Sequence, residues 1–378
     1  MINVGIDAHM LGDHSGGNES YYRNILSNMR IPDDMTIYLI VNSDAEVYDF
    51  EDRYKIVRFK TKNAFFRTFF ELPKISRMYN IDVMHTQYFI PIHRNCKYVC
   101  TIHDICFEHF KNIFTKKQYY SQKILIPYAA KHSRKIFTVS EHAKSDIATC
   151  YGIRKNNILV TYNAVSSSFR VLNNEELDIE ELKKEYGINT DIYILSVGNL
   201  QPRKNLVRLI KAFKNIRMKN SDVQLVIVGN PAWRYNDILA EAISDVEDDS
   251  IIFTGYVSDR NLIRLYNAAT CFVYPSYYEG FGIPPIEAMA CETPVALSNA
   301  TSLPEVAGCA AIYFDPFKEE EIERAVDTLL EDGILRKTLV EKGKNQVNKF
   351  DWTKSANIIL ETYREVVEES SKDVYKEG

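Results

Sequence analysis

Two glutamates, Glu279 and Glu287, stand in the segment richest in chemically informative residues, YPSYYEGFGIPPIEAMACETPV (274–295). Two glycines and two prolines lie between them. Glycine lets backbone N–H groups approach a phosphate, a helix N-terminus favours anions, and proline is tolerated where a helix starts. A carboxylate accepts hydrogen bonds from vicinal hydroxyls. A helix-capping acid beside a tight turn explains either glutamate alone. The combination predicts a loop and helix start that bind a nucleotide sugar, with Glu287 in or near the first helical turn.

A second cluster is basic and lies in SVGNLQPRKNLVRLIKAF (196–213). A buried strand is expected to end at Gly198 and a helix to begin near Asn205, so that Arg203 and Lys204 fall in a strand-to-helix loop. Open α/β sheets bind ligands at such loops. Two cations beside a helix N-terminus suit a diphosphate and the negative charge that develops on it as it leaves. A solvated basic turn is the alternative for this loop taken alone.

Short apolar, β-branched runs that alternate with amphipathic segments must position these loops. They lie at 2–6, 36–41, 55–59, 82–86, 98–103, 135–140 and 158–162 in the first half, and at 193–198, 223–229, 251–255, 271–275, 293–298 and 310–314 in the second. Such runs between helices indicate parallel sheets covered on both faces. We therefore predict an α/β protein with two Rossmann-like, doubly wound domains, 1–168 and 169–354. A last helix, from Trp352 to about Glu369, follows from its apolar spacing.

Charge is distributed unequally along the chain, although the net charge is only −5. Residues 51–170 carry 21 lysines and arginines against 8 aspartates and glutamates, whereas residues 171–378 carry 23 against 35. All eight histidines lie between His9 and His142. The basic half suits an anionic partner such as a membrane surface, a lipid phosphate or nucleic acid.

Several classes of protein are disfavoured by what the sequence lacks. No apolar run approaches the ~20 residues that span a bilayer, and the N-terminus lacks the pattern of a secretory signal. The seven cysteines are scattered and form no CxxC pair, which predicts reduced thiols in a cytoplasmic protein. There is no HxxxH, HExxH or GxSxG motif and no Asp-x-Asp at a strand end, so we predict no metal site.

The two clusters and the overall layout resemble the GT-B fold glycosyltransferases of the retaining family GT4. The similarity runs from GIDAHML (5–11) through TYNAV (161–165) to the last helix, and the Glu-x₇-Glu and G-x₄-R-K patterns are fairly specific to that family. The resemblance implies two domains that face each other across a cleft, the first binding the acceptor and the second the nucleotide sugar. It also implies that a helix at about 355–370 crosses back to the first domain.

The resemblance further implies a role for individual residues. His103 would line the sugar site and act in catalysis with Arg203, Lys204 and Glu279. Glu279 would contact hydroxyls of the transferred sugar, and Glu287 those of the ribose. Further donor-binding residues expected on the same ground are Gly16, Gly17, Asn199, Gly255, Tyr256, Val257, Gly280, Phe281, Gly282 and Ile283.

The expected reaction is front-face transfer with retention, in which the leaving diphosphate takes the proton of the acceptor. The GIDAHML, TIHD, SEHAK and GNLQPRKN segments look most like bacterial mannosyltransferases of polysaccharide assembly. GDP-mannose is therefore the expected donor, with a UDP-sugar as the alternative. Neither a metal nor another cofactor is expected, because Arg203, Lys204 and backbone amides supply positive charge at the diphosphate.

The acceptor is expected to be a saccharide, and one segment bears on whether it is linked to lipid. Residues 58–80 interleave Phe65, Phe66, Phe69 and Phe70 with lysines and arginines. This pattern predicts an amphipathic surface on an anionic membrane, so that a cytoplasmic protein would contact the inner membrane peripherally. The alternative is a core helix with a charged outer face.

Two other classes remain open from the sequence. A GT-B enzyme of phosphorylase or epimerase type would share the fold, although no lysine motif for pyridoxal phosphate is evident. A nucleic-acid-binding protein would explain the basic first half, but there is no reader motif and the paired glutamates would have no role. We therefore expect no nucleic-acid partner.

Overall fold

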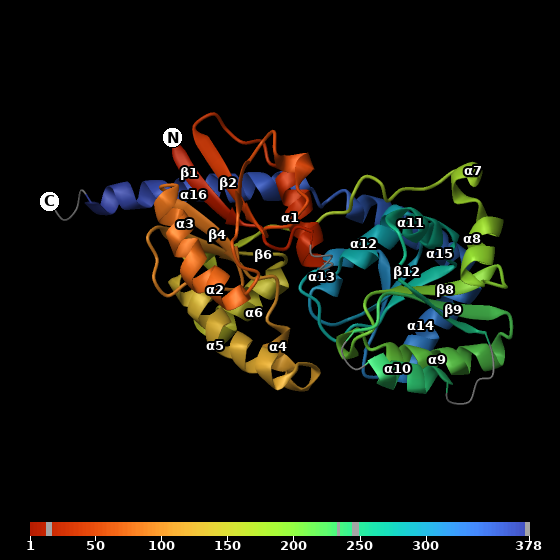
Figure 1. Cartoon of the computed structure of the whole chain (residues 1–378). Coiled ribbons are helices and arrows are strands. Elements are labelled where there is room, and N and C mark those ends of the chain that lie inside the picture. The colour runs from red at the N-terminus through yellow and green to blue at the C-terminus, as the bar shows by residue number, and fades with distance from the viewer. Residues whose placement is uncertain (13–16, 233–234, 244–248, 375–378) are drawn as a thin grey trace. The chain divides into compact units, whose positions relative to one another are not determined.

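The chain forms two compact units in a computed structural model that describes residues 1–12, 17–232, 235–243 and 249–374. Unit 1 comprises Met1–Asn163 and Asp351–Gly378, and unit 2 comprises Ala164–Phe350. The boundary after Asn163 lies a few residues before the junction expected between 168 and 169. Each unit is a parallel sheet covered by helices (Figure 1).

The described strands of unit 1 form one parallel sheet in the order β3-β2-β1-β4-β5-β6-β7. Their bounds are β1 (Ile2–Asp7), β2 (Met35–Val41), β3 (Lys55–Arg58), β4 (Val83–Gln87), β5 (Lys97–Thr101), β6 (Lys135–Thr138) and β7 (Ile158–Val160). All five residues of β4 are buried, as expected for a central parallel strand with helices on both faces.

The described α-helices of unit 1 are α1 (Gly17–Asn28), α2 (Ala64–Phe66), α3 (Leu72–Met78), α4 (Cys106–His109), α5 (Lys116–His132), α6 (Glu141–Tyr151) and α16 (Trp352–Val374). Local sequence sets several of their ends. Thr115 and Gln118 form a capping box at the start of α5, and the left-handed Gly152 ends α6. Both devices satisfy backbone groups that a helix end leaves unpaired.

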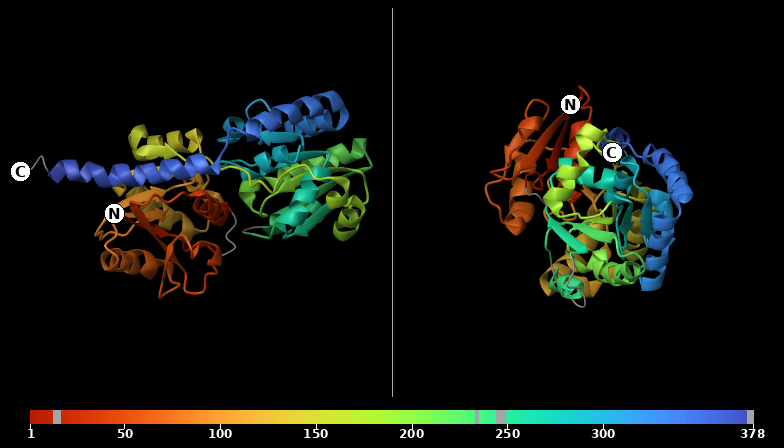
Figure 2. Two further views of the ribbon diagram at one scale, coloured as in Figure 1. Left: turned by 90° about the horizontal axis from the view of Figure 1, so that it is seen from above. Right: turned by 90° about the vertical axis from the view of Figure 1, so that its right-hand side faces the viewer.

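The C-terminal helix α16 packs on unit 1, which confirms the predicted crossing back. Its Ala356, Ile359 and Tyr363 side chains are fully buried. The Tyr363 hydroxyl lies 2.6 Å from Nδ1 of His85 on β4. The left-hand view of Figure 2 shows α16 running along unit 1.

The segment 58–80 is not one amphipathic helix, because its first residue still belongs to β3 and a π-helical turn, Arg67–Glu71, separates α2 from α3. The turn directs Arg67 inward. Its side chain is buried, stacks on Phe59 and donates to Oδ1 of Asn42 at 3.0 Å. Arg67 therefore does not belong to the basic outer surface that the sequence suggested, and Phe69 is half-buried.

The described strands of unit 2 form a second parallel sheet in the order β10-β9-β8-β11-β12-β13. Their bounds are β8 (Ile192–Val197), β9 (Val223–Val228), β10 (Ile251–Gly255), β11 (Cys271–Tyr274), β12 (Val295–Ser298) and β13 (Ala311–Phe314). The described helices are α7 (Asn174–Leu177), α8 (Ile179–Tyr186), α9 (Leu206–Lys219), α10 (Tyr235–Ile243), α11 (Asp259–Ala268), α12 (Ile283–Ala290), α13 (Leu303–Ala307), α14 (Glu319–Glu331) and α15 (Gly333–Val347).

The predicted fold class is confirmed, because every predicted apolar run overlaps an observed strand and each unit has one parallel sheet. Separate apolar cores cover the two faces of the unit 2 sheet, with Leu195 and Phe272 in one and Ile194 and Val273 in the other. Neighbouring strand residues therefore bury opposite faces of the sheet. Among the described residues, no helix is both long and apolar enough to cross a bilayer.

Candidate functional site

The two predicted clusters meet at one edge of the unit 2 sheet. The strand order reverses between β8 and β11, which are neighbours in the sheet but distant in the chain. Loops that leave the carboxyl ends of such strands diverge, and open α/β sheets bind ligands in the crevice between them. The loop after β8 carries Arg203 and Lys204, and the loop after β11 carries Glu279.

The Glu279 carboxylate joins these two loops through two ion pairs. Its Oε2 accepts from Nη1 of Arg203 at 2.7 Å, and its Oε1 accepts from Nζ of Lys204 at 2.8 Å. Arg203 also donates to the carbonyl oxygen of Tyr278 at 2.9 Å. Glu279 is only 5% exposed and Lys204 only 8%, whereas the Arg203 side chain is 21% exposed. The structure therefore brings together three of the four residues to which we assigned catalytic roles.

Burial alone would raise the pKa of Glu279, but the charges of Arg203 and Lys204 outweigh it and lower that pKa to about 2. The carboxylate is therefore ionised at neutral pH. Two cations and one anion leave a net positive charge at the strand ends. This cluster can attract a further anion. Burying its cations costs less free energy of desolvation than burying a lone cation, because Glu279 already compensates one positive charge.

Two residues outside the predicted set hold this cluster in place. The Tyr274 hydroxyl accepts a hydrogen bond from Lys204, whose Nζ also lies 4.6 Å above the Tyr274 ring. Asn205 has a left-handed backbone with φ of 56°, and its side chain donates to the carbonyl oxygens of Pro275 at 3.0 Å and Pro316 at 2.7 Å. Asparagine tolerates this conformation better than most residues. Tyr274 ends a strand in the sequence, but nothing there shows that its hydroxyl meets Lys204.

The glycine loop before α12 is tightly packed at Gly282. Its φ is 94°, and a Cβ placed there would lie 2.7 Å from Cδ2 of Leu303. The Ser302 hydroxyl is within hydrogen-bond distance of the carbonyl oxygens of both Glu279 and Phe281, at 2.9 Å each. The Phe281 ring is buried, so that only its backbone is placed to meet a ligand. Gly282 is thus required by conformation and by space.

Further donor-binding candidates differ in what they offer to a ligand. Gly280 is buried, Ile283 is the half-buried first residue of α12, and Asn199 is exposed after β8. We predicted no role for Gly229, which directly follows the neighbouring strand β9. A Cβ at Gly229 would lie 2.2 Å from the carbonyl oxygen of Gly198, so the backbones of the two loops touch.

Glu287 is the fifth residue of α12, which begins at Ile283, and so lies directly after the first helical turn, near the helix start as expected. Its Oε2 accepts a hydrogen bond from the Tyr266 hydroxyl at 3.0 Å. Burial raises the pKa of Glu287 to about 7, although the Tyr266 hydroxyl opposes the shift. The pKa values of the two glutamates are therefore shifted in opposite directions, because only Glu279 has cations beside it.

The segment assigned to the base follows β10 at the same edge of the sheet. Gly255 has a φ of 71° and Tyr256 is 76% exposed. Val257 is only 6% exposed and packs in the core of unit 2. Only the backbone of Val257 can therefore contact a base, a limit that the sequence pattern does not reveal.

His103 lies in unit 1, just after β5. It is 8% exposed, its Nε2 is 3.0 Å from Nε2 of Gln87, and its ring meets that of Tyr21 edge to face. Burial lowers the pKa of His103 to about 4, so its ring is neutral at pH 7. Gly17 is the first residue of α1, and Gly16 lies outside the described residues.

Unit 1 contains a polar network to which we assigned no role from the sequence. It lies between β1 and β4, where the strand order of the unit 1 sheet reverses. Oδ1 of Asp7 lies 2.8 Å from Nδ1 of His9, and the Asn42 side chain donates to the His9 carbonyl at 2.9 Å. Burial would raise the pKa of Asp7, but His9 and then Arg67 lower it overall. An ionised Asp7 can accept a hydrogen bond from Nδ1 of His9 and so orients the His9 ring.

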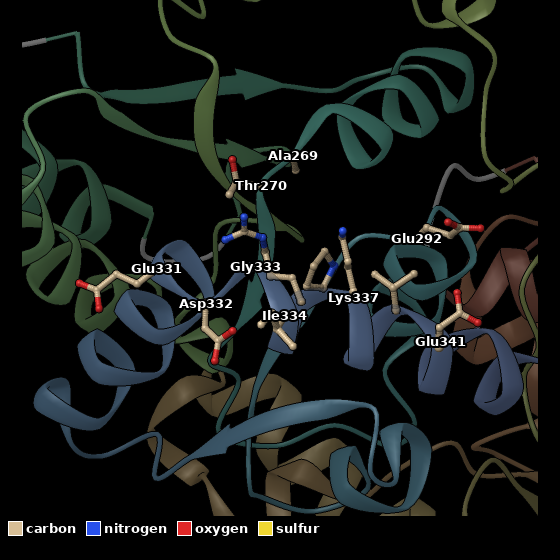
Figure 3. A pocket seen from close by; sticks show the side chains of 12 residues that line it. Ala269, Thr270, Glu292, Glu331, Asp332, Gly333, Ile334, Lys337 and Glu341 are labelled. Atoms are coloured by element: carbon tan, nitrogen blue, oxygen red, sulfur yellow. The ribbon is translucent and has the colours of Figure 1, made fainter.

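A wide depression of about 1270 Å³ lies elsewhere in unit 2 (Figure 3). Thr270 and Pro294, which precede β11 and β12, line it together with residues of α14 and α15. This is the amino-terminal edge of the sheet, opposite the edge that carries Glu279. None of the predicted site residues lines this depression.

The fold and the cluster define a class of protein with two Rossmann-like units and a cationic site at a strand-order reversal. Two family models match the chain: "Glycosyltransferase Family 4" over residues 15–169 and "Glycosyl transferases group 1" over residues 178–346. Escherichia coli O-antigen chain mannosyltransferase B is 31% identical over 297 residues, which cover 76% of this chain and 75% of that relative. The chain therefore belongs to the group 1, family 4 glycosyltransferases, and it is an enzyme that transfers glycosyl groups.

Two further similarities extend this result. The serotype-specific mannosyltransferase WbdA of Escherichia coli is 29% identical over 286 residues, which are 73% of this chain but only 34% of that relative. This chain thus spans about a third of WbdA. The solved structure of Anabaena HepE in complex with UDP-glucose superposes with a TM-score of 0.74 at 17% identity and covers 97% of this chain and 100% of that one. This likeness supports the GT-B fold.

Replacing Glu279 by glutamine should destabilise the protein in a pH-dependent way. The pKa of about 2 in the folded state lies below the usual glutamate pKa of 4.5, so the ionised carboxylate stabilises the fold above about pH 4.5. This contribution, about 3 kcal/mol, is lost as the pH falls towards 2. Denaturant unfolding of E279Q and the wild type at several pH values should give a difference in unfolding free energy that is largest near pH 7.

The matched control is E331Q, which changes an exposed glutamate at the end of α14 and should have little effect. A difference between E279Q and the wild type that stays constant from neutral to acidic pH would contradict the strong coupling of Glu279 to Arg203 and Lys204.

Proposed function

We propose that this enzyme transfers mannose from GDP-mannose, with retention of configuration, to a saccharide acceptor in cell-surface polysaccharide assembly. The observation that carries the donor site is the pairing of Arg203 and Lys204 with Glu279 at the strand-order reversal of unit 2. A diphosphate needs positive charge at this edge, and the adjoining sugar and ribose need hydrogen-bond acceptors. Glu279, in the loop after β11, and Glu287, on the following helix α12, supply these hydrogen-bond acceptors.

Mannose as the transferred sugar is supported by relatives, whose names include O-antigen chain mannosyltransferase B and the mannosyltransferase WbdA. A UDP-sugar is the alternative donor, because HepE, which has the same fold, was solved with UDP-glucose. Unit 1 offers hydrogen-bonding groups for a saccharide at His9 and His103. We assign the acceptor to that unit and the donor to unit 2.

In the proposed reaction the bond from the anomeric carbon to the diphosphate oxygen breaks while the acceptor oxygen bonds to the same face of that carbon. The acceptor proton passes to the leaving diphosphate. Arg203 and Lys204 stabilise the charge that develops on the diphosphate, and backbone N–H groups near Gly282 add to this. Glu279 holds both cations in position and faces the sugar. The chemistry uses no metal or other cofactor in this proposal.

Replacing Lys204 by methionine should slow transfer by about 10²–10³-fold, because one of the groups that stabilise the leaving diphosphate is lost. The measurement is hydrolysis and transfer with GDP-mannose, UDP-glucose and other common sugar nucleotides, with the anomeric form of the released sugar followed by NMR. GDP-mannose should be the best donor, and α-mannose should be released first.

The matched control is K342M, since Lys342 is exposed on α15, and melting curves of both variants check folding. Near-normal turnover by a folded K204M variant would remove the proposed role of Lys204. Early release of the β-anomer would contradict retention, and preference for a UDP-sugar would replace GDP-mannose by the alternative donor.

The affinity for the nucleotide sugar should rise with pH up to about 7 and then level off. Ribose hydroxyls donate to a carboxylate, so binding favours the ionised form of Glu287, whose pKa lies at about 7 in the free protein. Below that pKa the affinity should fall by up to about tenfold per pH unit. Isothermal titration calorimetry with GDP-mannose measures it, and E287Q should bind more weakly and show no such slope. A slope that survives in E287Q would place its origin elsewhere.

We also propose that unit 1 contacts an anionic membrane through a phenylalanine patch formed by Phe65, Phe66 and Phe70. Their side chains are 57%, 54% and 59% exposed, and each ring contacts the other two. Exposed Lys74 and Arg77 follow on α3. Aromatic side chains with basic residues around them suit the interface of an anionic bilayer, which would bring a lipid-linked acceptor to unit 1.

Changing Phe66 and Phe70 to serine should reduce binding to phosphatidylglycerol vesicles at least tenfold, which corresponds to about 1.4 kcal/mol. Co-sedimentation at low salt measures this. The matched control M218S changes a residue of α9 in unit 2 that is 80% exposed. If the wild-type protein fails to sediment with these vesicles, or if M218S loses as much binding, the patch has no such role.

A further inference from the structure

Three side chains with different ligand atoms converge on the surface of unit 1, apart from the residues discussed so far. His109 ends α4, and Asp146 and Cys150 lie one turn apart on α6. Nε2 of His109 is 2.9 and 2.8 Å from the two carboxylate oxygens of Asp146, and Sγ of Cys150 is 3.6 Å from Oδ1 of Asp146. The three ligand atoms all lie within 4.8 Å of one another.

These separations are close to those of ligands around one tetrahedral ion. Zinc binds nitrogen and oxygen at about 2.0–2.2 Å and sulfur at about 2.3 Å, which places neighbouring ligand atoms about 3.4–3.6 Å apart. The Cys150–Asp146 separation already has this value. The His109–Asp146 contact needs to open by only about half an ångström as the hydrogen between them is replaced by the ion.

We propose that His109, Asp146 and Cys150 form a binding site for a zinc-like divalent ion, with water as the fourth ligand. Residues four apart on a helix present their side chains on one face, so Asp146 and Cys150 need no backbone movement to share an ion. An imidazole, a carboxylate and a thiolate together favour a borderline metal such as Zn²⁺ over Mg²⁺ or Ca²⁺, which prefer oxygen ligands alone.

The surrounding charges also favour a cation at this place. The carboxylates of Asp146 and Glu108 both interact with Cys150, and a bound divalent ion would compensate their negative charge directly. The positive charge of Lys123 opposes binding of a cation, but the Glu108 carboxylate offsets that charge through an ion pair with Lys123.

An ion at this site would link α4 to α6. α4 is a single helical turn that directly follows the segment carrying His103. At the start of α4, Oδ1 of Asp104 accepts a hydrogen bond from the backbone N–H of Cys106 at 3.0 Å. Linking His109 to α6 would therefore restrain the chain just beyond His103. The two helices, α4 and α6, are labelled below the unit 1 sheet in Figure 1 and meet through His109 and Asp146. The expected consequence is a more stable unit 1.

The sequence did not reveal this site, and we predicted no metal. His109 is separated from Asp146 by 37 positions, and the Asp-x₃-Cys pair alone is too common to indicate a metal. The alternative is a surface ion pair between His109 and Asp146 with a cysteine beside it, which the experiment must distinguish.

The test is a titration of the full chain, freed of metal by a chelator, with Co²⁺ and then Zn²⁺. The wild type should bind one ion per chain and show the thiolate-to-cobalt charge-transfer band, and Zn²⁺ should displace Co²⁺ and raise the melting temperature. C150S should abolish the band, and H109Q and D146N should weaken binding at least tenfold.

The matched control is C309S, which removes the other exposed thiol and should leave binding unchanged. No cobalt band in the wild type, or a band that persists in C150S, would overturn the proposal, and an ion pair without metal would remain. Melting curves of the metal-free variants establish that they fold. Neither result bears on the donor site, because none of the three residues belongs to unit 2.

Discussion

The proposed donor site depends on one buried ion cluster, in which the Glu279 carboxylate lies between Arg203 and Lys204. The cations and the carboxylate come from loops that follow different strands, so the ion pairs join the two sides of the crevice at the carboxyl edge of unit 2. A buried carboxylate without these cations would be costly to ionise, and the cations would be costly to bury without it. The cluster thus fixes loop geometry and local charge together.

The parallel topology explains why this cluster forms where it does. In each unit the strand order reverses once, between β1 and β4 and between β8 and β11, and loops diverge there because their crossover helices lie on opposite faces of the sheet. Unit 2 fills this position with cations and unit 1 with the Asp7–His9 pair. The same feature of the fold therefore carries a polar cluster of different composition in each unit.

The sequence was sufficient to predict the fold and to bring Arg203, Lys204 and Glu279 to one edge of a sheet. It was insufficient to predict the orientation of many side chains. Apolar runs identify parallel strands because both faces of such strands must be covered. Whether Val257 and Phe281 point into the core, or Arg67 turns inward at a π-helical turn, depends on packing between segments far apart in the chain. The hydrogen bond from Lys204 to the Tyr274 hydroxyl is equally unpredictable from the sequence, because it joins positions seventy residues apart.

The unequal setting of the two glutamates shows how a repeated residue type acquires different roles. Glu279 has two cations within hydrogen-bond distance and stays ionised, whereas Glu287 has only the Tyr266 hydroxyl and titrates near neutrality. A carboxylate that is already paired is suited to hold other groups in place, and one without a cation is suited to accept hydrogen bonds from incoming hydroxyls. The Glu-x₇-Glu spacing places both beside the same glycine loop, but burial and neighbouring charge, not spacing, separate what each can do.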